Sequence, residues 1–346
     1  MVHSIFAGEK RPKKPSTVLR ELLEGPEILF RPGVGIAIQA QIAEAVGFKA
    51  VGLSGANTAA HIFGLPDAGL MTLPEIVENV RRVVGAVTIP VIADCDTGFG
   101  NAINVRRTVN EIIKAGAAGL FIEDQVSPKR CGFVRGKEVI PIDEAVSKYR
   151  AAVDARDALD DDFVLIARTD ARGVAGGSVE DVIRRGKAYR DAGMDMIYAE
   201  ALQSPEEIRM VAKALGKPFT CTYGDFKPTP TMQELQEWGL SMTASGFFVV
   251  AGLTGMWDLA VRMKEEGLQA FHQFTEEMTP HPLGKFGLFD LTGFAEVQAW
   301  EQRYLDATHD RDYDRSIGEY DPRYGHPAFA EFRRKAAAAA AAEKKD

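Results

Sequence analysis

A cysteine and two cations stand together in a glycine-rich stretch, and this is the clearest chemical signal in the sequence. The stretch runs from Gly119 to Pro141 and has Lys129-Arg130-Cys131-Gly132 at its centre. Neighbouring positive charges favour a thiolate over a thiol, which suits sulfur for acid–base or nucleophilic chemistry. We therefore predict that Cys131 is catalytic and that Lys129 and Arg130 support it. A solvated basic loop with a chance cysteine is the alternative interpretation.

Carboxylates form a second signal, because they recur where short apolar runs end. In Asp94-Cys95-Asp96 the two aspartates point to one side of an extended chain, since alternate residues of a strand do so. A single acid at such a place could merely cap the next helix, but capping does not explain a whole set. Gathered at one rim, the acids would repel one another unless a divalent cation joined them, and oxygen ligands suit Mg²⁺ or Mn²⁺ rather than zinc. The acids of this set are Asp67, Asp94, Asp96, Glu123, Asp124, Asp170 and Glu200.

Arg168 lies among these acids in sequence. It could form a structural salt bridge, or its guanidinium fork could clamp a substrate carboxylate. Ser54 and the backbone of Gly55 and Ala56 could donate to a second carboxylate. His61 falls in an apolar loop and is predicted to be a packed residue rather than a ligand. These residue types together predict a site for a small, multiply anionic substrate.

Bringing these residues together requires strands that end at a common edge. Eight short, mostly apolar runs alternate with amphipathic stretches, which is typical of a parallel sheet covered by helices. The count and the chain length favour a (β/α)₈ barrel, whose strands all end at one opening. An open doubly wound sheet is the alternative, because one sequence does not reveal strand order. The predicted strands are Ile28–Phe30, Ala50–Gly55, Pro90–Asp96, Gly119–Gln125, Phe163–Asp170, Met196–Ala201, Pro218–Tyr223 and Met242–Phe248.

Helices are predicted between the strands and at both ends of the chain. A short helix, Ser16–Leu23, is expected to be capped by Ser16 or Thr17. Glycines that follow helical patterns, at positions 47, 116, 193 and 216, are expected to end those helices. The inner helices are Ile36–Val46, Leu73–Val84, Val105–Ala115, Ile142–Ala158, Val179–Ala192 and Pro205–Leu215.

The chain divides into an arm at 1–18, a catalytic barrel at 19–266 and a helical C-terminal extension at 267–346. In the extension, Leu268–Met278 and Phe294–Leu305 are predicted helices, and His309–Tyr324 is a predicted loop. The alanine run Ala336–Ala342 has high helix propensity but little apolar bulk, so a frayed terminal helix is expected.

Composition excludes several classes of protein. The 346 residues carry 41 Lys and Arg against 49 Asp and Glu, a net charge of -8 with no basic stripe, which argues against nucleic-acid binding. Three cysteines without a close-spaced pair argue against zinc ribbons and disulfide frameworks, and favour a reducing cytoplasm. No apolar run reaches the ~20 residues of a membrane span.

Six linked motifs resemble the isocitrate lyase/phosphoenolpyruvate mutase superfamily, and the likeness covers roughly residues 19–266 in order and spacing. Within it, the likeness is greatest to methylisocitrate lyase and the 2-alkylmalate lyases, such as dimethylmalate lyase. The motifs are Ser54-Gly55, Gly64-Leu65-Pro66-Asp67, Asp94–Gly100, Ile122–Gln125, Lys129–Gly132 and Ala167–Asp170.

The resemblance implies a (β/α)₈ barrel whose last helix is exchanged between neighbours, usually in a homotetramer. It implies Mg²⁺ held at Asp94, with Asp67, Asp96 and Glu123 acting largely through waters. Carboxylate contacts would come from Ser54, Gly55 and Arg168, with Gly132 and Glu200 also lining the substrate site. Cys131 would be the proton donor on a gating loop.

Two positions depart from the family pattern. Phe133 stands where the cleavage enzymes usually carry a histidine that helps to bind substrate, which suggests a different or less polar substituent there. In the seventh strand, where the family often has Asn, Thr222 is the expected replacement, and a Glu that follows in the family has no clear match.

The resulting hypothesis is a Mg²⁺-dependent carbon–carbon lyase that cleaves a 2-hydroxy di- or tricarboxylate to a 2-oxo acid and a carboxylate. Glu123 or a metal-linked water would be the base, and Cys131 would protonate the enolate. Oxaloacetate hydrolysis or decarboxylation, and phosphorus–carbon chemistry on phosphonopyruvate, are the alternatives within the superfamily. The mutase branch typically has Asn and Thr in this loop, so Cys131 argues against it. A barrel that has lost catalysis is the alternative from another class.

Overall fold

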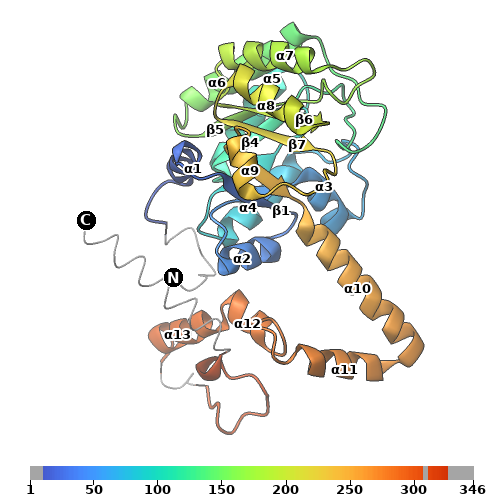
Figure 1. Ribbon diagram of the computed structural model, residues 1–346. Coiled ribbons are helices and arrows are strands. Elements are labelled where there is room, and N and C mark those ends of the chain that lie inside the picture. Colours follow the sequence, from blue (N-terminus) through green and yellow to red (C-terminus); the bar gives the residue numbers. More distant parts are fainter. Residues whose placement is uncertain (1–10, 307–310, 326–346) are drawn as a thin grey trace. The chain divides into compact units, whose positions relative to one another are not determined.

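Eight parallel strands alternate with helices in the part of the chain that the predicted barrel occupies (Figure 1). The computed structural model describes residues 11–306 and 311–325. These residues form two compact units, one made of 11–84 and 88–249, and the other of 85–87 and the described residues from 250 onwards. All the described strands lie in the first unit, whereas the first ten residues and the alanine run Ala336–Ala342 lie outside the described part.

The strands run in the order β7-β6-β5-β4-β3-β2-β1-β8, and hydrogen bonds join the two ends of this order. The Ser241 N–H donates to the Phe219 carbonyl at 2.8 Å, and Thr220 Oγ1 donates to the Met242 carbonyl at 2.7 Å. The sheet therefore curls into a nearly closed barrel, which confirms the predicted fold class over the open sheet. The strands are β1 Leu29–Val34, β2 Val51–Leu53, β3 Val91–Asp94, β4 Gly119–Glu123, β5 Val164–Thr169, β6 Met196–Leu202, β7 Phe219–Tyr223 and β8 Met242–Ser245.

Helices wrap the outside of the barrel, and most of the predicted ones are present within a few residues. Glycines 47, 116, 193 and 216 have positive φ at or just after helix ends, as the pattern predicted. The helices up to the end of β8 are α1 Pro15–Glu24, α2 Ala37–Val46, α3 Gly55–Thr58, η2 Ala59–Phe63, α4 Leu73–Ala86, α5 Ala102–Lys114, α6 Ile142–Asp157, α7 Val179–Asp191, α8 Pro205–Leu215 and α9 Met232–Glu237.

Three local predictions were wrong. The last strand ends at Ser245 rather than Phe248, because the apolar run that follows Gly246 begins helix α10, and periodicity cannot separate short buried strands from helices. The first strand extends through Pro32 to Val34 instead of ending at Phe30. The N-cap of α1 is Lys14, while Ser16 Oγ donates to Asp160 Oδ2 at 2.8 Å.

The core lies inside the strands and under α1. Leu19 and Leu23 of α1 are buried in one cluster with Leu29, Val164 and other residues near the strand starts. Leu19 lies over Gly119, where an added Cβ would be 3.2 Å from Leu19 Cδ2. Apolar side chains therefore fill the amino-terminal end of the barrel, so the polar residues at the carboxyl ends of the strands face the other opening.

The remaining described residues are mainly helical. The predicted helix Leu268–Met278 is present with these bounds, and the helix predicted at Phe294–Leu305 ends one residue earlier. In the predicted loop His309–Tyr324, the described residues contain only one short helical turn. No helix in the described ranges has the length and apolarity that crossing a membrane requires. The elements are α10 Phe247–Glu266, α11 Leu268–Met278, α12 Gly287–Thr292, α13 Phe294–Tyr304 and η4 Pro322–Tyr324.

Candidate active site

The strand ends bring the predicted acids and Arg168 together. Asp94 and Glu123 are the last residues of β3 and β4, and Glu123 pairs in register with Arg168 of β5. Glu200 lies near the end of β6, the next strand of the sheet. Because parallel strands of a barrel end at one face, residues separated by about a hundred positions become neighbours.

Arg168 is the centre of the cluster on β4 to β6. Its Nε lies 3.2 Å from Glu123 Oε2 and 2.9 Å from Asp170 Oδ2, and its Nη2 lies 3.4 Å from Glu200 Oε2. The guanidinium also stacks 5.3 Å from the centroid of the Tyr198 ring. Burial alone would lower the pKa of Arg168, but Asp170, Glu123 and Glu200 raise it well above its ordinary value. Arg168 therefore forms the salt bridges of a structural residue, and its guanidinium also lies at the barrel mouth, where a substrate clamp would have to be.

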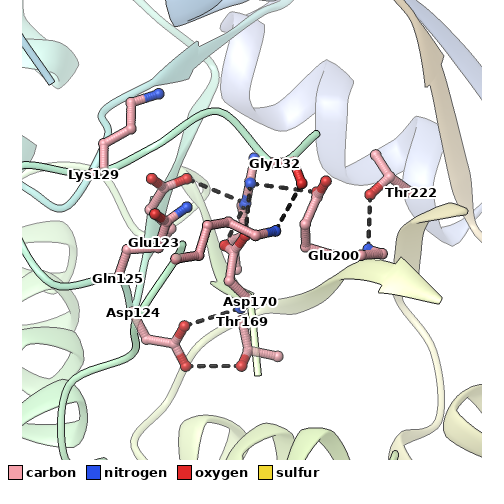
Figure 2. Close-up of polar contacts among 12 residues, drawn as sticks. Glu123, Asp124, Gln125, Lys129, Gly132, Thr169, Asp170, Glu200 and Thr222 are labelled. Carbon is pink, nitrogen blue, oxygen red and sulfur yellow. Dashed lines mark hydrogen bonds and ion pairs between the residues drawn. The ribbon is translucent and has the colours of Figure 1, made fainter. Parts of the chain in front are cut away.

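Glu123 and Asp124 point to opposite sides of the β4 end (Figure 2). Burial raises the pKa of Glu123 well above its ordinary value, although the Arg168 guanidinium opposes this shift. Glu123 Oε1 is buried and has no hydrogen-bond partner among the described residues. Asp124, in contrast, accepts hydrogen bonds from several side chains behind the sheet and is a structural residue.

Lys129 lies among the acids that the sequence predicts as metal ligands. Its side chain is 4% exposed, and its Nζ contacts Asp67 Oδ1 and lies 3.0 Å from Asp96 Oδ1. Burial opposes the charge of Lys129, but the surrounding acids, led by Asp94 and Glu123, raise its pKa. Burial and Asp94 in turn raise the pKa of Asp96 to about 6, against the effect of Lys129. The positive charge of Lys129 is therefore paired with the carboxylates of Asp67 and Asp96.

The surroundings of Cys131 favour the thiol over the thiolate that the flanking cations predicted. Burial raises the pKa of Cys131, a backbone hydrogen bond at Phe133 opposes this shift, the Asp67 carboxylate adds to it, and Lys129 opposes it. The prediction was wrong because Lys129 is neutralised by acids and Arg130 is exposed. A protonated thiol remains suited to donating a proton.

The loop that carries Cys131 is held against the barrel mouth. The Cys131 N–H donates to the Asp67 carbonyl at 3.1 Å, and the Gln125 side chain bonds both the N–H and the carbonyl of Arg130. Gly132 lies so close to Glu200 that an added Cβ would be 2.1 Å from Glu200 Oε1. The loop is thus closed over the acids, with Phe133 pointing outward at 83% exposure.

The donors predicted at the end of β2 are engaged within the protein. Ser54 Oγ caps α3 by accepting from the Asn57 N–H, and the Gly55 N–H donates to Asp94 Oδ2 at 2.8 Å. Ala56 lies in the first turn of α3. His61 Nδ1 lies 2.9 Å from the Asn57 carbonyl, which fits its prediction as a packed residue.

Thr222 supports the backbone beside Glu200. Its Oγ1 accepts from the Ala201 N–H at 3.1 Å (Figure 2). Ala201 has φ of 64°, a left-handed conformation that is costly for alanine, at a register irregularity between β6 and β7. Thr222 thus supports the irregular part of β6 that follows Glu200.

The acids near Asp94 offer the oxygen ligands that a hard divalent cation prefers, although they are not already grouped around one point. Every acid near Asp94 offers oxygen, and the buried, unpartnered Oε1 of Glu123 is a free acceptor. Within the described ranges, no three His, Cys, Asp or Glu side chains are grouped to hold a metal directly. Carboxylate oxygens such as these are suitable ligands for Mg²⁺.

Lys137 and Gln125 take part in this site and were missed by the sequence reasoning. Lys137 is 5% exposed and lies 2.9 Å from Asp170 Oδ1. In the sequence, the one sign that Lys137 could belong to the site is its place in the same glycine-rich stretch. A lysine there would ordinarily be expected to be exposed to solvent.

The barrel and its acid-lined, loop-covered mouth define a (β/α)₈ enzyme with its site at the carboxyl ends of the strands. Residues 19–260 match the phosphoenolpyruvate phosphomutase family model. The chain belongs to this family, within the phosphoenolpyruvate mutase/isocitrate lyase superfamily, as the motifs predicted.

Three curated relatives are lyases. Isocitrate lyase of Haloferax volcanii is 43% identical over 60% of this chain and 59% of its own length. The 2-methylisocitrate lyase of Aeropyrum pernix is 44% identical over 66% and 72%. The 2,3-dimethylmalate lyase of Eubacterium barkeri is 38% identical over 69% and 83%. The chain thus spans less than two thirds of the first of these relatives.

Solved structures extend the likeness beyond the lyases. A 2,3-dimethylmalate lyase has a TM-score of 0.76 at 32% identity, covering 89% of this chain and 99% of its own. Oxaloacetate acetylhydrolase in complex with 3,3-difluorooxalacetate has a TM-score of 0.75 at 32% identity, covering 84% and 98%. Phosphonopyruvate hydrolase in complex with oxalate and Mg²⁺ has a TM-score of 0.74 at 29% identity, covering 85% and 100%.

Proposed function

We propose that this protein is a Mg²⁺-dependent lyase that cleaves the C2–C3 bond of a 2-hydroxy di- or tricarboxylate, of the 2-methylisocitrate or 2-alkylmalate type. The observation that carries the proposal is the position of the Cys131 loop, whose Gly132 packs against Glu200 and Arg168 beside Glu123. The three lyase relatives support the same reaction class.

Arg168 would bind a substrate carboxylate, because its guanidinium is already oriented by Asp170 and stacked on Tyr198. Asp94 would hold Mg²⁺ directly, with Asp67, Asp96 and Glu123 completing the site largely through waters. Bound Mg²⁺ supplies stabilisation of negative charge on the substrate oxygens. The Ser54–Ala56 turn would lie against a second carboxylate.

The proton transfers are assigned to Glu123 and Cys131. Glu123 accepts the proton of the 2-hydroxyl, since a raised pKa makes a carboxylate a stronger base. The C2–O bond becomes a carbonyl, the C2–C3 bond breaks and its electron pair forms the enolate of the departing carboxylate. The Cys131 S–H then protonates the enolate carbon, and the closed loop excludes water from it. When the loop opens, Glu123 releases the hydroxyl proton to solvent and the Cys131 thiolate takes a proton from solvent, which restores both groups.

A panel of 2-hydroxy di- and tricarboxylates with Mg²⁺ tests this function, with release of pyruvate or glyoxylate as the readout. We expect at least one member to yield a 2-oxo acid, and chelation by EDTA to stop the reaction. Cys131→Ala is the second test. It should reduce turnover by about 10³-fold, while substrate binding, measured by calorimetry, is kept. The proposal fails if no member yields a 2-oxo acid, or if Cys131→Ala cleaves near normally.

Oxaloacetate hydrolysis is the second candidate, supported by the likeness to oxaloacetate acetylhydrolase and by Phe133 in place of the usual histidine. Oxaloacetate belongs in the same panel, with oxalate and acetate as products. Oxalate release without any 2-oxo acid from the 2-hydroxy acids would favour this candidate.

A homotetramer with an exchanged last helix is proposed for the assembly. None of the 20 residues of α10 is buried, and its exposed apolar side chains include Val250, Leu253, Met256, Trp257 and Val261. Light scattering on the eluting protein should give four times the chain mass, and a monomer at micromolar concentration would contradict the proposal. The three free cysteines fit a reducing cytoplasm, which we propose as the location.

A further inference from the structure

A buried lysine joins the tip of the Cys131 loop to the barrel. Lys137 lies in the returning arm of the loop, where the Val126 N–H donates to the Glu138 carbonyl at 2.9 Å and Gln125 pairs with Val139 in an antiparallel bridge. Its side chain is 2% exposed. Lysines are rarely buried so completely unless their charge is paired.

The two described partners of the Lys137 ammonium lie on different segments. Nζ donates to the Gly132 carbonyl, next to Cys131, at 2.8 Å, and lies 2.9 Å from Asp170 Oδ1 at the end of β5. The same Asp170 Oδ1 accepts from Arg168 Nη2 at 3.1 Å. One carboxylate therefore holds both the guanidinium of the proposed substrate clamp and the ammonium that reaches the loop tip.

The space around these groups is shaped by two glycines. A Cβ at Gly173 would be 2.7 Å from Lys137 Nζ and 3.1 Å from its Cε, so any larger residue would push the ammonium out of its place. A Cβ at Gly132 would be 2.9 Å from Arg168 Nη2. The ammonium and the loop tip thus occupy fitted positions, which indicates a specific contact rather than a chance burial.

We propose that Lys137 is the positioning residue that latches the Cys131 loop closed, by tying the Gly132 carbonyl to the Asp170–Arg168 pair. Opening the loop breaks the bond to Gly132, while the base of the loop and the Lys137–Asp170 pair stay in place. The inference rests on the proposed function in one respect, namely that this loop covers the active site.

Alkylation of Cys131 by iodoacetamide measures loop opening without any substrate. Cys95 and Cys221 are 0% and 4% exposed, so labelling of the native protein reports on Cys131. Lys137→Met should raise the labelling rate about tenfold, the effect expected for losing one charged hydrogen bond. Gly173→Ala keeps the lysine but fills its place, and should raise the rate in the same direction by a smaller factor.

Lys148→Met is the matched control, because Lys148 is also a buried lysine, but its Nζ donates to the Thr97 carbonyl after β3 rather than to Gly132. Its labelling rate should equal that of the wild type. Mn²⁺ binding should be unchanged by Lys137→Met, which a general loss of structure would not allow. If Lys137→Met does not fold, Gly173→Ala carries the test.

Unchanged labelling in folded Lys137→Met, or in Gly173→Ala when that variant alone folds, would overturn the latch. Equal acceleration in Lys148→Met would overturn it too, since the effect would then be a general loosening. The labelling result does not depend on which substrate the enzyme cleaves. Failure of the substrate panel and failure of the latch are therefore separate outcomes.

Discussion

Two adjacent carboxylates at the end of β4 have opposite environments. Glu123 faces the barrel mouth, where Oε1 has no hydrogen-bond partner in the described part of the chain and Oε2 lies 3.2 Å from Arg168 Nε. Asp124 faces the helices behind the sheet and is fully engaged. It accepts from Thr169 Oγ1 at 2.8 Å, Tyr189 OH at 2.7 Å, Arg185 Nη1 at 3.1 Å and the Asp170 N–H at 3.0 Å.

The difference between Glu123 and Asp124 shows how adjacent residues of a barrel strand can have separate roles, one in the candidate site and one in the scaffold. Side chains alternate between the two faces of a strand. The two acids therefore lie at the same strand end but have different surroundings and different hydrogen-bond partners. The outer acid is saturated by donors and ties α7 to the sheet. The inner acid keeps an open oxygen, which is what a ligand, a metal-bound water or a transferred proton requires.

The largest effect should come from removing the inner charge. Glu123→Gln should reduce turnover by about 10²–10⁴-fold, because an amide cannot accept the hydroxyl proton. The melting temperature should stay the same or rise, since a buried charge with one open oxygen is lost. Steady-state kinetics and calorimetry measure the two effects, and a large loss of stability with normal turnover would reverse the assignment.

Removing the outer charge should act on stability instead. Asp124→Asn removes the buried carboxylate that pairs with Arg185 Nη1, leaving Arg185 with its ion pair to Asp181, and should cost about 3 kcal/mol of unfolding free energy. Urea denaturation measures this, with Glu123→Gln as the matched neighbour. Folded Asp124→Asn protein should keep turnover within about threefold of the wild type, and a selective loss of turnover without loss of stability would break the comparison.

The pH dependence of stability should separate the two acids further. Burial raises the pKa of both, but that of Asp124 is lowered again by its donors, chiefly the Asp170 N–H and Tyr189, whereas Glu123 is opposed mainly by Arg168. A raised pKa in the folded state means that stability is present below the unfolded pKa and is lost as pH rises through the folded pKa.

Glu123→Gln in EDTA should therefore remove more of the stability loss seen on going from pH 4.5 to neutral pH than Asp124→Asn removes. Urea midpoints at each pH provide the measurement. Equal slopes in the wild type and Glu123→Gln would show that the inner acid is not perturbed.

The smallest expected effect is on the pH dependence of Cys131 alkylation. The alkylation rate of Cys131 should reach half its maximum above pH 9.0, the ordinary thiol value, because burial raises its pKa. Asp67→Asn should lower that midpoint by less than about one pH unit, since the Asp67 carboxylate adds to a shift that comes mainly from burial. A wild-type midpoint below pH 8 would restore the thiolate interpretation.

The location of the site was predictable from the sequence, whereas its protonation states were not. Asp94, Glu123 and Arg168 could be placed at one rim because apolar runs identify strands, and parallel strands end together. The thiolate at Cys131 was wrongly predicted from its neighbours in sequence, because Lys129 turns toward Asp67 and Asp96. Lys137 was not predicted at all, since its partners lie on another strand and on the loop tip.

Local sequence patterns were enough to predict the barrel, the order of its elements and the residue types at the strand ends, because periodicity and turn chemistry act over a few residues. The face to which each acid points, the pairing of cations with carboxylates and the direction of the thiol's pKa shift follow only from the packed structure. Those properties depend on the removal of water and on the sum of charges in space, and both arise only once the loop after β4 and the ends of β3 to β6 lie together.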